Sequence, residues 1–272
     1  MAMRPTPDVE IFENPKQWLT SYRDGWLDHF ERTGQFDWSK YVRPQNERAP
    51  SGKGVDLGKS RLMLVTSSGA YLRDTQQPFE DDNPFGDYRI RTFPSDTPLS
   101  EIGFAHRQYD HTFIEHDPQV LLPLGHLRNM VREGSIGELA PSVISFNGYL
   151  PNVLRIAKEV LPHILSVAQD ERVNAILLVP ASNLCIQSVG LLARGLELNC
   201  IATTFTSWSA GLALMTAPPR ATATNTLPGC ALGAPGDESQ QRRILEATLA
   251  LLEKDAPVDV VQLDEISNLG IH

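Results

Sequence analysis

A short and continuously apolar run, Ala175–Val179, ends at Pro180 and is followed at once by a segment with helical periodicity. A strand that is apolar at every position is covered on both faces, so the run predicts a central strand of a parallel sheet. Apolar residues then recur at three- and four-residue spacing, which gives one stripe able to pack back on the sheet. This stripe consists of Ile186, Val189, Leu192, Ala193 and Leu196.

The hydroxyl of Ser182 and the thiol of Cys185 lie where this strand becomes the helix. Unpaired amides and the dipole of a helix N-terminus favour an anion, so we expect the pKa of the Cys185 thiol to be lowered and its thiolate to be reactive. Two structural interpretations stand beside this one. Spacing alone favours Ser182 as the N-cap for the amide of Cys185. A free intracellular cysteine is also commonly a small buried hydrophobe.

A βα rhythm extends from Arg61 onward. Further strands are predicted over 61–66, 142–147 and 200–205, and a further helix over 239–253 with capping-box-like spacing between Asp237 and Gln240. The predicted fold class is therefore α/β, with a mainly parallel sheet and helices on both faces in a domain of residues 61–272.

The carboxyl ends of the predicted strands carry polar side chains, and such ends meet at one edge of an open parallel sheet. Their hydroxyls and backbone amides could bind a carboxylate close to Ser182, although ordinary turn chemistry explains the turn 66–71 as well. The predicted substrate-binding residues at these ends are Thr66, Ser67, Ser68, Asn147 and Thr206.

A histidine-rich stretch lies in the long segment between the first two predicted strands. Long irregular segments are often binding loops or lids, and this one holds His106, His111 and His116 at five-residue spacing. That spacing separates the three side chains on any single helix or strand, so no metal site is expected. We predict a polar wall of the site that includes Tyr109 and Asp110, with His106 or His111 as a general base.

The first sixty residues are predicted to be an appendage. Asn14-Pro15 can begin a helix, and residues 41–59 lack periodicity and are expected to form a connecting arm over the surface. The helix has an aromatic-rich face that must be buried, either on the chain's own core or on a second subunit. This face consists of Trp18, Leu19, Tyr22, Trp26, Leu27 and Phe30.

Composition narrows the class of ligand. A formal net charge of -9 disfavours nucleic acid, so a small molecule is expected. The odd, low count of 3 cysteines indicates a reducing compartment. The N-terminus lacks an apolar signal core, and the apolar runs fall short of the roughly 20 residues that span a bilayer. We expect a cytoplasmic protein that does not bind membranes. Cys230, in the loop 228–237, is predicted to be an accessible second thiol.

Five short motifs, in this order, resemble those of a known family. They are Thr66 through Leu72, Tyr109-Asp110 followed by Asp117 and Leu121-Leu122-Pro123-Leu124, Phe146-Asn147-Gly148-Tyr149, Pro180 through Gly190, and Gly233-Ala234-Pro235-Gly236-Asp237. Together they are similar to the substrate-cleaving B component of glycine, sarcosine, betaine and D-proline reductases, nearest to the D-proline branch. The resemblance covers most of the chain.

The resemblance implies reductive cleavage of a carbon–nitrogen bond next to a carboxylate. In that family a selenocysteine or cysteine attacks carbon, and a cysteine three residues later resolves the adduct. Cys185 matches the resolving position, and Ser182 stands at the position of the nucleophile. A hydroxyl is a poorer nucleophile than a selenol and cannot form a redox bond with Cys185.

Three functions therefore stay open. The first is an oxidoreductase in which Cys185 is the working thiol, and Cys230 or an external dithiol replaces the missing partner. The second is a non-redox lyase, hydrolase, isomerase or racemase that uses Cys185 with Cys230, or Ser182 with a histidine. The third is a catalytically idle relative that binds a ligand or a partner subunit.

The expected ligands and partners follow from these functions. The substrate is expected to be a small molecule that bears a carboxylate, and no cofactor is expected beyond an external dithiol. A homo-oligomer, a reductase partner subunit and a pyruvoyl-bearing partner are left open.

Overall fold

A mostly parallel sheet forms the centre of the computed structural model, which describes residues 10–266. The strand order is β10-β9-β8-β7-β1-β6-β3, with β5 paired to β1, and only β3 runs antiparallel to its neighbour. The strands are β1 (Arg61–Thr66), β3 (Ile90–Pro94), β5 (Glu138–Leu139), β6 (Ser142–Phe146), β7 (Ala175–Val179), β8 (Ala202–Ser207), β9 (Ala221–Asn225) and β10 (Val261–Ile266). A separate antiparallel pair joins β2 (Ala70–Leu72) and β4 (Ile102–Phe104).

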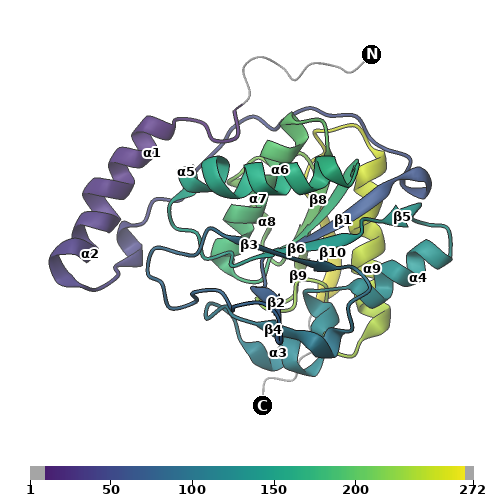
Figure 1. The fold of residues 1–272 in the computed structure, drawn as a ribbon. Coiled ribbons are helices and arrows are strands. Elements are labelled where there is room, and N and C mark those ends of the chain that lie inside the picture. Colours follow the sequence, from purple (N-terminus) through teal and green to yellow (C-terminus); the bar gives the residue numbers. More distant parts are fainter. Residues whose placement is uncertain (1–9, 267–272) are drawn as a thin grey trace.

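Helices cover both faces of this sheet, as predicted (Figure 1). Met63 and Val65 of β1 belong to one hydrophobic cluster, whereas Leu62 and Leu64 belong to another, because neighbouring side chains of a strand point to opposite faces. The first cluster includes α5 (Val153–Arg155), α6 (Leu161–Asp170), α7 (Asn183–Leu198) and α8 (Ala210–Leu214), and the second includes α3 (His111–His116), α4 (Leu124–Arg132) and α9 (Glu238–Leu249).

Shorter helical turns connect these elements. The 3₁₀ turns are Trp38–Lys40, Leu57–Lys59, Leu99–Glu101, Pro118–Val120 and Ala250–Glu253, and the π-helical turns are Tyr22–Leu27 and Ile156–Val160. The helix predicted over 239–253 thus comprises α9 and the 3₁₀ turn after it. Asp237 caps α9 by accepting the backbone N–H of Gln240 at 2.9 Å.

The strand-to-helix transition agrees with the prediction at its centre. All five residues of β7 are buried, and α7 begins at Asn183. The next strand differs, because Cys200 has a positive φ of 65° and belongs to the turn that ends α7. β8 therefore begins at Ala202 and ends at Ser207, so it contains Thr206, which lies directly after the strand predicted over 200–205.

The long segment after β1 is less irregular than its sequence indicates. It contains β2, β3, β4 and α3, and β3 closes one edge of the sheet as an antiparallel strand. Residues 73–89 form no helix or strand, so the prediction of an irregular segment is confirmed there and is wrong for β2, β3, β4 and α3. The role of this segment as a binding loop or lid stays a prediction. The strand β3 was not predicted because it is short and ends at a proline, and such a sequence is typical of a turn.

The N-terminal arm, residues 10–60, contains α1 (Pro15–Ser21), the π-helical turn and α2 (Asp28–Thr33), which extend beside the body of the molecule (Figure 1). Its aromatic face is covered by the chain itself, since Trp26 is fully buried and lies 4.9 Å from the ring of Phe36 and 5.9 Å from that of Tyr41. The buried guanidinium of Arg194 donates to the carbonyl oxygens of Ile11 and Arg48, which ties the arm to α7. Between residues 10 and 266, no helix is both long and apolar enough to cross a membrane.

Candidate functional site

Ser182 and Cys185 form one hydrogen-bonded unit at the start of α7. The Ser182 Oγ accepts the backbone N–H of Cys185 at 3.4 Å, which confirms the predicted N-cap. The same oxygen lies 3.0 Å from the Cys185 Sγ. The cap therefore holds a hydroxyl against the thiol, and the capping and chemical interpretations of Ser182 are compatible.

His106 completes this unit from a distant segment of the chain. Its Nε2 lies 3.1 Å from the Cys185 Sγ, and its Nδ1 accepts the backbone N–H of Gln108 at 3.1 Å. Burial, helped by nearby His111, lowers the pKa of His106 to about 3, so the ring is neutral near pH 7. Because Nδ1 accepts, the single ring proton is on Nε2 and points at the sulfur. In this tautomer His106 is a donor to Cys185 and not a base for it.

Burial also acts on the thiol. It raises the pKa of Cys185, and the hydrogen bond with Ser182 only partly opposes this effect. The predicted downward shift is therefore wrong. The sulfur is fully buried, and desolvation of a thiolate outweighs the helix N-terminus.

The backbone at Gly148 runs directly against the sulfur. A Cβ at this position would lie 2.4 Å from the Cys185 Sγ and 2.8 Å from the Ser67 Cβ, so only glycine fits without displacement. Ser67 accepts the backbone N–H of Ala181 through its Oγ at 3.0 Å. The ends of β1, β6 and β7 thus close around one thiol.

Most of the predicted substrate-binding side chains brace this corner of the sheet. The Thr66 hydroxyl donates to the Leu121 carbonyl at 3.0 Å, the Asn147 Nδ2 to the Ala105 carbonyl at 3.2 Å, and the Tyr109 hydroxyl to the Ser68 carbonyl at 3.0 Å. All of these side chains are buried.

Three other candidates do not contact the thiol. Asp110 caps α3 by accepting the Thr112 N–H at 2.9 Å. Thr206 is buried in β8, and its hydroxyl has no partner among the described residues. His111 donates from Nε2 to the His106 carbonyl at 2.7 Å and stacks on Tyr109, so it positions His106. Across residues 10–266, no group of three histidine, cysteine or acidic side chains is arranged to hold a metal ion.

Cys230 lies in a different environment from the accessible one predicted. The thiol is fully buried, and burial with the nearby carboxylates of Asp110 and Asp117 raises its pKa to about 12. Its loop is held against the body, because the Gly229 N–H donates to the Ala181 carbonyl at 2.9 Å. Cys185 and Cys230 are both free, as is the exposed Cys200.

A cavity of about 240 Å³ opens onto Ser182. Its lining includes residues that we had not predicted as part of the site. Tyr149 belongs to a motif quoted above, whereas Arg43 lies in the unpatterned connecting arm and no local signal identifies it. The lining residues are Trp38, Arg43, Gln108, Tyr149, Ser182, Asn183, Leu184 and Pro228.

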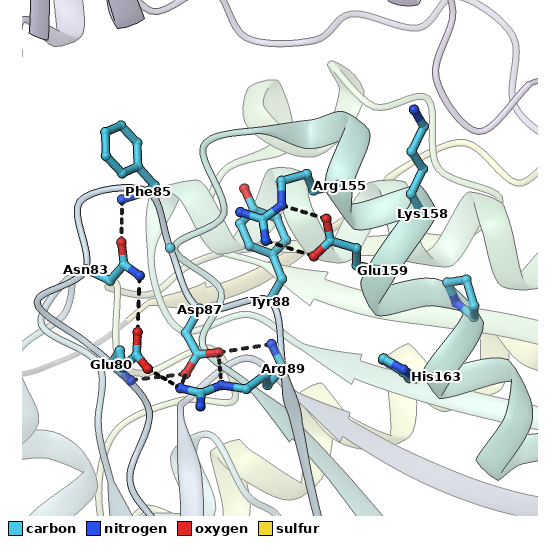
Figure 2. Close-up of a pocket in the computed structure, with 12 residues that line it drawn as sticks. Glu80, Asn83, Phe85, Asp87, Tyr88, Arg89, Arg155, Lys158, Glu159 and His163 are labelled. Atoms are coloured by element: carbon cyan, nitrogen blue, oxygen red, sulfur yellow. Dashed lines mark hydrogen bonds and ion pairs between the residues drawn. The ribbon is translucent and has the colours of Figure 1, made fainter. Parts of the chain in front are cut away.

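A larger cavity of about 520 Å³ lies between residues 80–89 and the helices α5 and α6, and it shares no lining residue with the first. Its charged groups are largely paired within its walls (Figure 2). Arg89 bonds Asp87 and Glu80, and Arg155 bonds Glu159. The candidate site is therefore the smaller cavity, which reaches the Ser182 and Cys185 unit.

Fold and site together define an α/β protein that holds a thiol at the N-terminus of the helix after its central strand. The family model for glycine/sarcosine/betaine reductase selenoprotein B matches residues 33–181, so the chain belongs to this family. The match ends directly before Ser182. The placement of Ser182 at the position of the family's nucleophile therefore stays a prediction.

Curated relatives agree with this family. The chain is 26% identical over 197 residues to D-proline reductase subunit gamma of Acetoanaerobium sticklandii, covering 72% of this chain and 80% of that one. It is 32% identical over 113 residues to sarcosine reductase complex component B subunit beta of Peptoclostridium acidaminophilum, covering 40% and 26%. Glycine reductase complex component B subunit gamma of the same organism is 22% identical over 235 residues, covering 82% and 52%. No solved structure matches.

The chain thus spans about a quarter of the sarcosine reductase relative and about half of the glycine reductase relative. The names of both place them in multi-component complexes.

Proposed function

We propose that this protein is a reductase component that cleaves the carbon–nitrogen bond of a small amino carboxylate, with Cys185 as its working thiol. The observation that carries the proposal is the Cys185 Sγ, which lies 3.1 Å from the His106 Nε2 and 3.0 Å from the Ser182 Oγ beside the cavity. An N–H and an O–H directed at sulfur stabilise its thiolate once the thiol ionises. Family membership supplies the reaction class.

The proposed reaction requires a thiol from outside the chain. The Cys185 thiolate attacks the carbon that carries the amino group, a carbon–sulfur bond forms, and the amine leaves with the electron pair of the broken carbon–nitrogen bond and takes a proton. An external dithiol then attacks the Cys185 sulfur, and the released carbon takes a proton to give the reduced acid. The second thiol of that reagent frees Cys185. The dithiol is oxidised, and the substrate is reduced by two electrons.

The source of this second thiol is the external dithiol and not Cys230. Cys230 is buried, and its pKa is raised to about 12, so it holds little thiolate near neutral pH. A partner subunit that carries a reactive thiol would serve the same purpose, in keeping with the complexes named for the relatives. A cytoplasmic location, a homo-oligomer and a pyruvoyl-bearing partner remain predictions.

A second candidate function rests on Ser182. Its side chain lines the cavity, whereas that of Cys185 lies behind it. A non-redox lyase, hydrolase, isomerase or racemase would use the Ser182 hydroxyl as the group nearest the substrate. Such an enzyme needs no dithiol.

The two candidates are separated by assaying the full chain on D-proline, sarcosine and glycine, with and without dithiothreitol, and following products by NMR. The redox proposal predicts turnover that requires dithiothreitol and is lost in Cys185→Ala. It also predicts a gain in Ser182→Cys, because that substitution restores two thiols one turn apart. Dithiol-independent turnover that survives Cys185→Ala and is lost in Ser182→Ala would establish the second candidate instead.

A further inference from the structure

The cavity at Ser182 is lined by a cation, Arg43, that has no acidic partner among the described residues. Arg43 is half-buried, and its only hydrogen bond among the described residues runs from the guanidinium to the Asn183 carbonyl at 3.3 Å. No carboxylate in residues 10–266 lies within ion-pair distance of it. A guanidinium has five N–H donors, so most of the hydrogen-bonding capacity of Arg43 is not used by the described residues, and Arg43 lines the cavity.

Some buried or half-buried arginines of this protein have an acidic partner, whereas the half-buried Arg91 and Arg128 donate to backbone carbonyls and do not line the cavity at Ser182. Arg155 pairs with Glu159 at 2.6 Å, and the fully buried Arg220 pairs with Glu197 at 2.8 Å. Burial lowers the pKa of Arg43, which means that its charge has lost hydration without a compensating anion. An anionic ligand would restore that compensation.

The surroundings of Arg43 select a small organic anion. None of the described residues that line the cavity is acidic, and the cavity volume of about 240 Å³ is below the ~300–1,000 Å³ typical of sites for larger ligands. Trp38 and Tyr149 meet edge to face at 5.9 Å and give the cavity an aromatic wall, while Gln108 adds an amide. Such a lining fits a carboxylate attached to a short apolar body.

The position of Arg43 relative to the thiol is fixed by α7. Its guanidinium bonds the carbonyl of Asn183, the residue next to Ser182, and the Asn183 side chain accepts the indole N–H of Trp208 at 2.9 Å. A carboxylate on Arg43 would therefore hold the adjacent carbon on the side of the cavity that Ser182 lines.

We propose that Arg43, carried by the N-terminal arm, binds the substrate carboxylate. The inference rests on the proposed function for the identity of the cavity as the substrate site, and it assigns the residue that recognises the amino carboxylate. It also gives the arm a role in binding, because a segment outside the sheet then completes the site.

The test compares a carboxylate with its uncharged amide. Binding of D-proline and D-prolinamide to the full chain is measured by ligand-observed NMR for the wild type, Arg43→Gln and Arg43→Lys. Loss of a charge-assisted hydrogen bond is expected to weaken D-proline binding by about tenfold or more in Arg43→Gln, with little change for D-prolinamide. Arg43→Lys keeps the charge but loses the planar fork, so an intermediate loss is expected.

A matched control separates recognition from general charge. Arg107 is exposed, pairs with Asp81 at 3.2 Å and precedes the cavity residue Gln108, so Arg107→Gln makes the same charge change near the cavity. It should leave the ratio of the two affinities unchanged. A merely structural role of Arg43 would weaken both ligands equally.

The proposal is overturned if Arg43→Gln leaves that ratio unchanged, or if the wild type does not prefer the carboxylate. Failure of the proposed function has a different signature. Selective D-proline binding through Arg43, combined with turnover that does not need Cys185, would remove the thiol mechanism and keep this carboxylate site.

Discussion

Cys185 and Cys230 are both fully buried thiols at the same edge of the fold, yet their surroundings differ in kind. An N–H of His106 and the hydroxyl of Ser182 lie within hydrogen-bond distance of the Cys185 sulfur. Cys230 instead has the negative charges of Asp110 and Asp117 nearby, and these raise its pKa further. The comparison teaches that the groups directed at a sulfur, and not its depth, distinguish a candidate nucleophile from a structural cysteine.

The largest expected effect comes from removing each thiol in turn. If the comparison holds, Cys185→Ala lowers dithiol-dependent turnover on the order of 10³-fold or more, because a nucleophile is lost. Cys230→Ala changes turnover by less than about threefold and costs only stability. The measurement is the steady-state turnover rate of each variant at equal concentration of folded protein. A similar loss of turnover in both variants would contradict the distinction between the two thiols.

Gly148→Ala tests how closely the Cys185 sulfur is held. A Cβ 2.4 Å from the sulfur has to displace it, so we expect a loss of about 1–3 kcal/mol in unfolding free energy and about 10²-fold in turnover. Gly211→Ala is the control, since nothing lies within 4 Å of a Cβ there. Both quantities can be measured by urea unfolding and by the turnover assay. Wild-type turnover in Gly148→Ala would show that the position of the sulfur is not critical.

The pH dependence of stability tests the neutral state of His106. The unfolded residue takes up a proton near pH 6.5, whereas the folded one does so only near pH 3, so the unfolded chain binds more protons between these values. Stability therefore falls as the pH is lowered through this window, by up to about 1.4 kcal/mol per pH unit from this residue.

Unfolding free energies at pH 7 and pH 5 measure this effect. The fall in unfolding free energy from pH 7 to pH 5 should be smaller in His106→Gln than in the wild type. His163→Gln, which alters an exposed histidine, should show the same fall as the wild type. An equal drop in the wild type and in His106→Gln would contradict a buried, neutral imidazole.

Much of the Cys185 corner could be predicted from sequence because it is local. The apolar strand, the proline, the Ser182 cap and the helical stripe lie within about one strand and one helix of each other. The parallel sheet followed from repeats of the same pattern. The weak strands β9 and β10 were missed because short alanine- and threonine-rich or alternating exposed segments resemble loops.

The rest depends on contacts between distant segments. His106 reaches Cys185 across 79 positions and Arg43 reaches Asn183 across 140, so no local spacing records either contact. The glycines and prolines near Cys230 predict a turn correctly, but they do not show whether the body of the protein covers it. The sign of the Cys185 pKa shift likewise depends on burial, which outweighs the helix N-terminus.

The most direct test of the central claim is the rate of iodoacetamide labelling at each cysteine, followed by peptide mass spectrometry in a Cys200→Ser background that removes the exposed thiol. Cys185 should be labelled faster than Cys230 at every pH from 7 to 9.5, with a rate that rises with pH because its raised pKa keeps it mostly protonated near neutrality. D-proline should slow this labelling. Faster labelling of Cys230 than of Cys185 would contradict the account.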